Sequence, residues 1–502
     1  MHIRGLRWYI CALLFFVTFI NYVDRVSLGA MAPLLQKSIG WDDAEFGWIN
    51  FAFTLSYALM FPVAGRMLDK FGVRVGLAIG VVLWSLGAIS HAFASTALGF
   101  AVARFVLGVG ESTNFPACVK AVAEWFPKSQ RSFATGIFNT GTNFAAMMQG
   151  GMMALAVGIG WQAAFVFIGV LGFVWLVGWL KFYRSPEEHP NLGPEEAKLI
   201  REGQEPPAPG VSVPWPVLLR YRQAWAFFVG KMLTDPVWWF YLTWLPSYLK
   251  RERDVTLTSA AGALAAIYIA ADFGSIVGGW IPGFLARRGM SAGRARIVTM
   301  LFCALGLPIS ACAVLADDLW TAVALISVAT ASHQAWSANM FTVASDAFPR
   351  RFVASVVGFG AMCGGIGGMF MNIVSGGMLQ WLGSYAPLFV FAGVMHPLAW
   401  IAIRLLSGKT IREVNLETDL RTGFSPALLG LGVGFSVAGI AAAGTVIANY
   451  DYVLSVTKNS GAAAAGGIAA GGILLIMGLA LIYACRAQRV GIIEGGSAPI
   501  AH

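Results

Sequence analysis

Most of the charged and titratable side chains that interrupt the apolar segments of this 502-residue sequence fall in four segments, the first, fourth, seventh and tenth. A charge at the centre of a bilayer costs roughly 2.5 to 3.5 kcal/mol on insertion scales, so these groups must share a polar cavity. A fold of three-helix repeats gives this period when the first helix of each repeat lines a central path. The pattern therefore indicates a solute path across a membrane. The residues are Asp24, Arg25, Arg104, Glu111, Lys231, Asp235 and His333.

The composition is that of a polytopic, all-α membrane protein. Hydrophobic residues make up 57% of the chain and charged residues 12%, with a mean hydropathy of +0.69, which soluble domains do not reach. Runs of about 20 apolar residues, long enough to cross ~30 Å of hydrocarbon, begin near positions 8, 44, 75, 97, 132, 161, 225, 262, 297, 320, 353 and 386. Two further runs cover about 424–449 and 463–485. We predict twelve transmembrane helices followed by two more.

Polar stretches divide the chain into parts. A proline-rich, charged stretch from Tyr183 to Arg222 separates two groups of six runs and is typical of a linker. A weak internal repeat supports the division, because Gly65–Arg74 after the second run recurs in degraded form at Gly283–Gly289 after the eighth. We expect an N-terminal six-helix bundle (1–183), a cytoplasmic linker (184–222), a C-terminal six-helix bundle (223–407), a second cytoplasmic linker (408–423), two additional helices (424–486) and a cytoplasmic tail (487–502).

The lysines and arginines between the runs predict the orientation. With a cytoplasmic N-terminus, 26 of the 34 lie in inner loops or tails, five in outer loops and three within the helices. The cluster Lys250–Arg253 is the contrary signal, and we interpret it as loop solvation. Both termini are therefore expected in the cytoplasm and the protein in the cell inner membrane.

Other classes of protein fit the sequence poorly. The net charge of +9 is spread over the inner loops and forms no basic patch for nucleic acid. The six cysteines are isolated, and no metal constellation, phosphate-binding loop or nucleophile motif occurs. We therefore expect no enzyme, no cofactor and no metal. The expected partners of this monomer are membrane lipid, a small anionic solute and protons.

Several motifs resemble the major facilitator superfamily. The segment Gly65–Arg74 is similar to the loop signature that follows the second helix in that superfamily. Asn21–Arg25 and Arg104–Glu111 resemble its anion:cation symporter family, and Trp238–Phe240 with His333–Ser337 look most like the hexuronate transporter branch. The resemblance covers about residues 3 to 415 and implies two six-helix bundles that transport an organic anion. The last two predicted helices depart from this pattern.

Arg25 is the main candidate for holding an anionic substrate. Its guanidinium is always protonated, and its planar fork matches a carboxylate. A structural ion pair with Asp24 or Glu111 is the alternative. Lys231 lies where the internal symmetry places a counterpart to Arg25 and could give the anion a second cationic contact. Alternatively, Lys231 and Asp235, four residues apart, neutralise each other.

Uncharged polar and aromatic side chains in the same helices are candidates for binding sugar hydroxyls and stacking on a sugar ring. On the tenth helix His333, Trp336 and Asn339 recur every three residues, which predicts a polar face with an aromatic platform. Each such residue could equally be a satisfied core group. We interpret Asp272 as a structural partner of the Arg287 loop region or of a gate, and His396 as peripheral. The further binding candidates are Tyr22, Asn139, Thr142, Asn143, Gln334 and Asn372.

Asp24 and Glu111 are candidate proton-coupling residues, together with Arg104. Burial and nearby arginines act on these carboxyls in opposite directions, which makes their protonation switchable. A permanent bridge between helices is the alternative for Glu111. A monoanion entering a cell with a negative interior moves uphill by ~2.3 kcal/mol per 100 mV, so one co-transported proton cancels that cost and a second drives entry.

The loop after the second run is a candidate cytoplasmic gate. The charge of Asp69 could pair with neighbouring helix ends in one state and separate from them in the other. Simple loop solvation is the alternative. The gating candidates are Gly65, Arg66, Asp69, Lys70, Gly72 and Arg74.

Together these features predict proton-coupled symport of a sugar acid, such as a hexuronate or an aldonate, by alternating access. Two alternatives stay open. An organophosphate or organic-anion exchanger would need no proton site, so Asp24 and Glu111 argue against it. A transport-fold solute sensor would need a signalling domain, and none is recognisable.

Overall fold

The computed structural model describes residues 2–41, 43–201, 218–219, 221–253, 257–382 and 384–414, and the regular elements in these ranges are all helices. The all-α prediction is therefore confirmed for these ranges. The two additional predicted helices (424–486), the predicted tail (487–502) and most of the linker before them lie outside the described residues.

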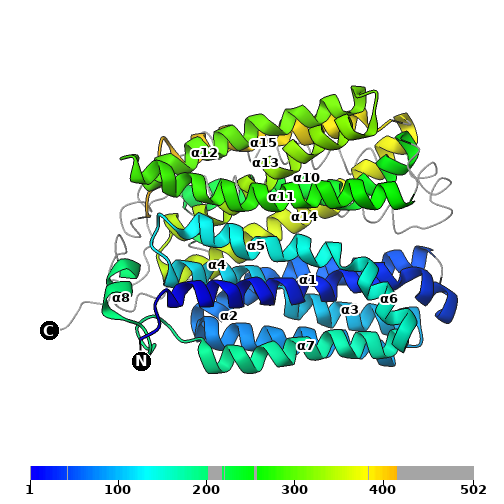
Figure 1. Cartoon of the computed structure of the whole chain (residues 1–502), viewed down its shortest axis with the longest axis horizontal. Coiled ribbons are helices and arrows are strands. Elements are labelled where there is room, and N and C mark those ends of the chain that lie inside the picture. Colours follow the sequence, from blue (N-terminus) through cyan, green and yellow to red (C-terminus); the bar gives the residue numbers. More distant parts are fainter. Residues whose placement is uncertain are drawn as a thin grey trace, which may run out of the picture.

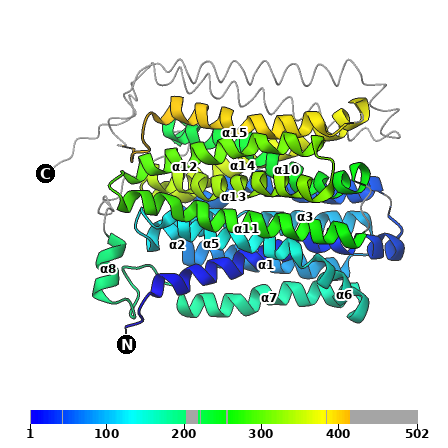
Figure 2. The same ribbon diagram turned by 45° about the horizontal axis from the view of Figure 1, so that its top comes forward.

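The first half of the chain forms one bundle, drawn in blue to teal in Figures 1 and 2. On its outer side lies α7, whose mean hydropathy of 2.3 suits a helix that faces lipid. The helices are α1 (Leu6–Ile39), α2 (Asp43–Ser90), α3 (Ala97–Glu111), α4 (Asn114–Trp125), α5 (Arg131–Met147), α6 (Gln149–Ile159) and α7 (Trp161–Phe182).

The second half forms a second bundle beside the first (Figure 1). Its helices are α10 (Arg222–Glu252), α11 (Leu257–Arg287), α12 (Ala292–Gly306), which continues as a 3-10 helix (Leu307–Leu315), α13 (Leu319–Ala347), α14 (Arg350–Leu382) and α15 (Ala386–Ser407). The short helix α8 (Pro194–Arg201) lies between the halves in sequence, and Glu196 in it pairs with Arg7 at the start of α1 at 2.6 Å. We call this end of the molecule, where α1 begins, the proximal end.

α2 consists of two helices that meet at Gly72. The backbone there is non-helical, with φ 79° and ψ 164°, a region that glycine adopts readily. A straight helix would separate Ser56 from Trp84 by about 40 Å. Both instead pack on the same turn of α3, because a Cβ at Gly108 would overlap Ser56 and one at Gly110 would overlap Trp84. The chain therefore folds back at Gly72, where the sequence predicts the loop.

A break at Ser112 and Thr113 separates α3 from α4. Pro116 explains it, because proline has no N–H to bond the carbonyl of Ser112 four residues earlier. The hydroxyls of Ser112 and Thr113 bond back to carbonyls of the preceding turn at 2.7 and 2.8 Å. The break leaves Glu111 as the last residue of α3, fully buried inside the protein.

Each of the twelve predicted runs before residue 408 begins inside a helix. By length and composition, seven stretches of the described chain are apolar enough to cross a membrane, and one of them, Glu45–Phe93, contains both helices of α2. The structure therefore supports a multi-pass membrane protein. The total of fourteen crossings stays a prediction.

The two halves contact each other through α2 with α14 and through α5 with α11. Glycines permit the close approach of α2 and α14. A Cβ at Gly65 would overlap the carbonyl of Ala354, and one at Gly358 would overlap the carbonyl of Phe61. Gly65, a gating candidate, thus lies at the interface between the halves.

Candidate functional site

A cavity of about 270 Å³ lies between the halves, close to the lower end of the ~300–1,000 Å³ typical of small-molecule sites. Its charged wall residues are Arg25 from α1 and Lys231 and Asp235 from α10. Eight of the predicted binding residues line it, namely Tyr22, Arg25, Asn139, Thr142, Asn143, Lys231, His333 and Gln334. The wall also contains Tyr57, Phe61, Phe115, Gln149, Trp238, Trp239, Thr243, Tyr268, Ser337 and Phe341.

Arg25 forms an ion pair with Glu111 that joins α1 to the end of α3. Its Nε and Nη2 donate to Oε2 of Glu111 at 2.9 and 2.7 Å. The rings of Tyr22 and Tyr57 each lie 4.3 Å from the guanidinium carbon, within the range of a cation–π contact. The ion pair considered as an alternative to substrate binding therefore exists in this structure, while Arg25 still lines the cavity.

Asp24, next to Arg25 in the chain, makes no such pair with any described residue. Its side chain is 2% exposed, and within the described part of the chain neither carboxylate oxygen has a hydrogen-bond partner. Arg104 donates to the backbone carbonyl of Arg25 at 3.1 Å. The N-terminal half thus buries two carboxyls and two guanidinium groups near the cavity. Of the two carboxyls, Asp24 is the one that has no side-chain hydrogen bond among the described residues.

Lys231 pairs with Asp235 on the same helix, at 2.7 Å. The Lys231 ammonium also lies 4.1 Å from the centre of the Phe341 ring. The side chain of Asp235 is 22% exposed, against 6% for Lys231. The mutual neutralisation considered for this pair is therefore present, and both residues still face the cavity.

The face of α13 that lines the cavity differs from the predicted one. Relative to His333, a helix turns Ser337 by about 40° and Phe341 by about 80°, but Trp336 by about −60° and Asn339 by about −120°. The indole N–H of Trp336 donates to Thr234 at 3.2 Å, and the Asn339 amide donates to backbone carbonyls. Both are buried in the C-terminal half and do not line the cavity. Residues spaced three apart point in directions that change by about −60° at each step, so they do not share one face.

His333 is held between two neighbours. Trp238 stacks on it with ring centres 5.2 Å apart, and its Nδ1 lies 3.0 Å from Nε2 of His396. His396 is fully buried, so its interpretation as peripheral is wrong. The cavity wall here is therefore aromatic, with Trp238 and His333 both lining it.

Three predicted binding residues on α5 face the second half. The Asn139 amide donates to Gln334 at 2.8 Å, and the Asn143 amide donates to Asp272 at 2.6 Å. The hydroxyl of Thr142 bonds back to the carbonyl of Asn139 at 2.9 Å. Asp272 is therefore a partner of Asn143 and not of the Arg287 region. The side chain of Asn372 lies outside the described residues.

Among the gating candidates, Asp69 contacts both halves. Its Oδ1 accepts from Lys120 at 2.7 Å, and its Oδ2 accepts from the backbone N–H of Ser355 in α14, also at 2.7 Å. Arg74 instead bonds the carbonyl of Leu180 within its own half. Asp69 thus ties α2 to the first turns of α14 at the proximal end.

The remaining gating candidates make weaker contacts. Arg66 is half-buried at the proximal end, and Lys70 is exposed with its ammonium 5.2 Å from the ring of Phe71. These two side chains are consistent with the loop-solvation alternative.

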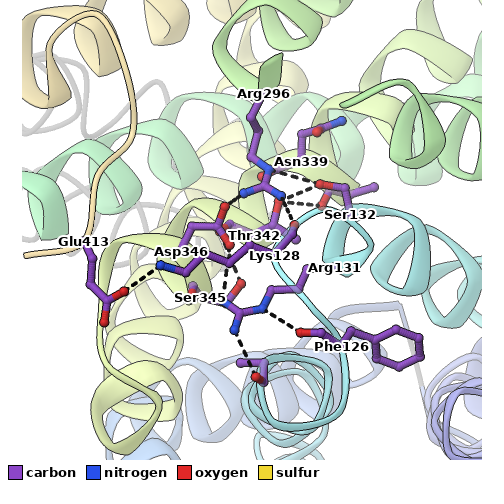
Figure 3. A network of polar contacts seen from close by, with 12 residues as sticks. Phe126, Lys128, Arg131, Ser132, Arg296, Asn339, Thr342, Ser345, Asp346 and Glu413 are labelled. Atoms are coloured by element: carbon purple, nitrogen blue, oxygen red, sulfur yellow. Dashed lines mark hydrogen bonds and ion pairs between the residues drawn. The ribbon is translucent and has the colours of Figure 1, made fainter. Parts of the chain in front are cut away.

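A second link between the halves at the proximal end centres on Asp346 of α13 (Figure 3). Arg131 of α5 lies 3.3 Å from Oδ1 of Asp346, and Arg296 of α12 pairs with Oδ2. Arg131 also donates to the carbonyls of Phe126 and Ser345. The Arg131–Asp346–Arg296 network is almost fully buried, so the halves are firmly joined at this end.

Residues 14–307 match the family model of the Major Facilitator Superfamily. The chain is also 32% identical over 429 residues to the hexuronate transporter of Escherichia coli (strain K12), covering 83% of this chain and 98% of that protein. The chain belongs to the major facilitator superfamily. It is therefore a member of a family of membrane transporters and not an enzyme.

Other known proteins agree with this placement. The galacturonate transporter of Dickeya chrysanthemi is 35% identical over 286 residues, which cover 56% of this chain and 82% of that protein. Among solved structures, the proton:xylose symporter XylE bound to 6-bromo-6-deoxy-D-glucose matches with a TM-score of 0.64 at 13% identity, over 81% of this chain and 98% of that one. The fold of this chain is thus the major facilitator fold.

Sequence reasoning misses several residues of this transporter. Tyr57 gives no signal, because one aromatic residue in an apolar run is ordinary. Arg131 counts in the sequence only as an inner-loop topology determinant, and Asp346 lies at the end of α13, away from His333 in the middle of that helix. No group of three or more His, Cys, Asp or Glu residues that could hold a metal occurs in the part of the chain the structure describes.

Proposed function

We propose that this protein is a secondary active transporter that carries a small sugar acid, such as a hexuronate or an aldonate, into the cell together with protons. The observation that carries the proposal is Arg25, a cavity-lining cation whose present partner, Glu111, is a buried carboxylate. The sugar-acid transporters to which the chain is similar support the choice of substrate class.

The substrate carboxylate would compete with Glu111 for Arg25. A planar guanidinium can bond one carboxylate through two parallel N–H groups, so the two anions exclude each other at the same fork. Lys231 on the opposite wall offers a second cation, which a uronate hydroxyl or a second carboxylate could reach. The amides of Asn139 and Gln334 and the ring of Trp238 provide hydrogen bonds and an apolar plane for the sugar.

Displacement of Glu111 links substrate to protons. A buried carboxylate that loses its cation is costly as an anion, so it takes up a proton instead. Asp24 is already buried without a hydrogen-bond partner among the described residues and would hold a second proton. Two protons carried with one monoanion would bring one net positive charge into the cell. The membrane potential would then drive this transport with ~2.3 kcal/mol per 100 mV.

The described state fits one step of alternating access. The excess of basic residues in the predicted inner loops supports an orientation in a cell inner membrane with the proximal end toward the cytoplasm, and cytoplasmic termini belong to the same proposal. The Arg131–Asp346–Arg296 network and the Asp69 contacts join the halves at that end. These contacts support an assignment of the structure to the state that is closed toward the cytoplasm.

Counterflow in proteoliposomes tests the proposal. Liposomes loaded with one sugar acid should take up the same labelled acid, and a panel of hexuronates, aldonates, sialic acid and sugar phosphates would rank the substrates. We expect uronates or aldonates to exchange and an inward proton gradient to drive their accumulation. Exchange of sugar phosphates alone, without a response to the proton gradient, would contradict the proposal and favour the exchanger.

A further inference from the structure

The contacts between α5 and α11 form a seam that ends at the cavity. Figure 1 shows the two helices side by side, α5 in the first half and α11 in the second. Asn143 lines the cavity, and so does Tyr268, one turn beyond Asp272 on α11. From the proximal end, the contacts are Gly283 with Ser129, Gly279 with Ser132, Ser275 with Gly136 and Asn139, and Asp272 with Asn143.

Asp272 is the last contact of this seam and its one carboxyl among the described residues. Its Oδ1 accepts from the Asn143 amide at 2.6 Å, whereas its Oδ2 is buried and has no hydrogen-bond partner within the described part of the chain. The residue is 7% exposed. Within the described chain, no lysine, arginine or histidine forms an ion pair with its carboxylate.

The charged groups on the helices around α11 are engaged elsewhere or lie at the ends of the helices. Lys231 pairs with Asp235, and His333 contacts His396. The proximal-end network uses Arg131 on α5, Arg296 on α12 and Asp346 on α13 (Figure 3). Further charged residues lie near the ends of their helices, namely Arg287 on α11, Arg294 on α12, and Arg222 and Glu252 at opposite ends of α10.

An isolated carboxylate anion in such a place is costly, while a neutral carboxylic acid with one accepted hydrogen bond is tolerated. Opening of the proximal end must separate α5 from α11, since the seam joins the two halves. Asn143 then leaves Asp272, and water reaches the carboxyl and stabilises the anion.

We propose that Asp272 is a proton-binding site of the C-terminal half, loaded while the seam is closed and emptied when the seam opens. The proton enters from cavity water, because Asn143 and Tyr268 beside it face the cavity. On opening, the O–H bond breaks and the proton passes to water on the proximal side. This inference rests on the proposed alternating access and adds a proton carrier to Asp24 and Glu111.

Infrared spectroscopy of the purified protein tests the loaded state without transport. At neutral pH the spectrum of Asp272→Asn should lack one carbonyl band of a protonated carboxylic acid that the wild type shows. Ser275→Ala is the matched control, because it removes a seam hydrogen bond but no carboxyl. An unchanged band in Asp272→Asn would overturn the proposal. If that variant does not fold, Asp272→Ser serves the same comparison.

The ratio of protons to substrate tests the emptied state. In proteoliposomes, Asp272→Asn should still exchange substrate, but the number of protons carried per substrate should fall by one relative to the wild type and to Ser275→Ala. An unchanged ratio would show that Asp272 keeps its proton and is not a carrier. A wild type that moves no protons with substrate would refute the proposed function, while the infrared result would still decide whether Asp272 binds a proton.

Discussion

Arg25 and Lys231 both line the cavity and both contact a carboxylate, yet the Arg25 pair joins two helices and the Lys231 pair lies within one. Arg25 binds Glu111 across α1 and α3, with Glu111 fully buried at a helix break. Lys231 binds Asp235 one turn away on α10, and Asp235 is 22% exposed. The first carboxylate is therefore released only when another anion or a proton replaces the bond, whereas the second remains near its cation in any state of the transporter.

This difference assigns separate tasks to the two halves. Under the proposed function, the N-terminal pair links substrate to proton, because Arg25 and Glu111 lie on different helices. Under the proposed function, the C-terminal pair attracts an anion, and both of its members lie on one helix, so the pair does not link two helices. Mutations in the two pairs should therefore affect transport to different degrees and in different ways.

Removal of Arg25 should have the largest effect. Arg25→Ala deletes the cation that would bind the substrate carboxylate, and loss of one partner of such a buried charge pair typically costs 2–5 kcal/mol, or about 30-fold to several thousand-fold in affinity. We expect binding and transport of the sugar acid to be abolished while the protein still folds. Binding can be measured as thermal stabilisation by the substrate, with Arg288→Ala, at the surface of the proximal end, as the control. Substrate-dependent stabilisation that survives in Arg25→Ala would rule out this role.

Glu111→Gln should separate exchange from accumulation. The amide has nearly the same shape but cannot gain or lose a proton, so the coupling between substrate and proton is lost. Counterflow should continue, and accumulation driven by a pH gradient should disappear. Both can be followed with labelled substrate in the same proteoliposomes. Accumulation at the wild-type level would make Glu111 a structural residue.

The fold could be predicted from the apolar runs and from the glycine-containing loop because both signals depend on short stretches of sequence. The twelve runs begin in helices, and the reversal at Gly72 follows from a backbone that favours glycine. The period of three segments also places Arg25, Lys231 and His333 on one cavity. These features depend on the position of a residue along the chain, which the sequence gives directly.

The partners of the charged residues could not be predicted in this way. Asp24 and Glu111 are both candidates for Arg25 by sequence, and only the break before Pro116 places Glu111 against its Nε and Nη2. The contact of Asp272 with Asn143 depends on how α11 packs on α5. Both pairings are set by the packing of distant helices, on which sequence spacing carries no information.

Mutations in the Lys231–Asp235 pair should reduce transport less than loss of Arg25 does. Because the two charges neutralise each other, removing both should be less harmful than removing Lys231 alone. Lys231→Met leaves Asp235 as an uncompensated charge in the cavity, which repels an anionic substrate, and we expect about a 30-fold loss in apparent affinity. The double variant Lys231→Met with Asp235→Asn should recover to about threefold below the wild type, because the two effects are coupled. Competition for labelled substrate measures both. Equal losses in the single and double variants would show that Lys231 binds the substrate independently of Asp235.

Truncation after Thr422 should have the smallest effect, since it leaves both bundles complete and removes only residues 423–502. The runs 424–449 and 463–485 contain no Asp, Glu, Lys, Arg or His, so they offer neither an anion site nor a proton site, and their many glycines suit packing against other helices.

The segment before the cut does contact the two bundles. Glu413 pairs with Lys128 at 2.6 Å, and the backbone N–H of Val414 donates to the carbonyl of Ala347, next to Asp346, at 2.8 Å. A cut after Thr422 keeps these contacts, and transport per folded molecule should stay within about tenfold of the full chain. A matched cut after Gly408 removes them and should slow transport further by loosening the proximal end. Equal transport rates for the two truncated proteins would show that residues 409–422 do not affect the contacts at the proximal end. A loss beyond about tenfold in the protein cut after Thr422 would show that the last two runs take part in the mechanism.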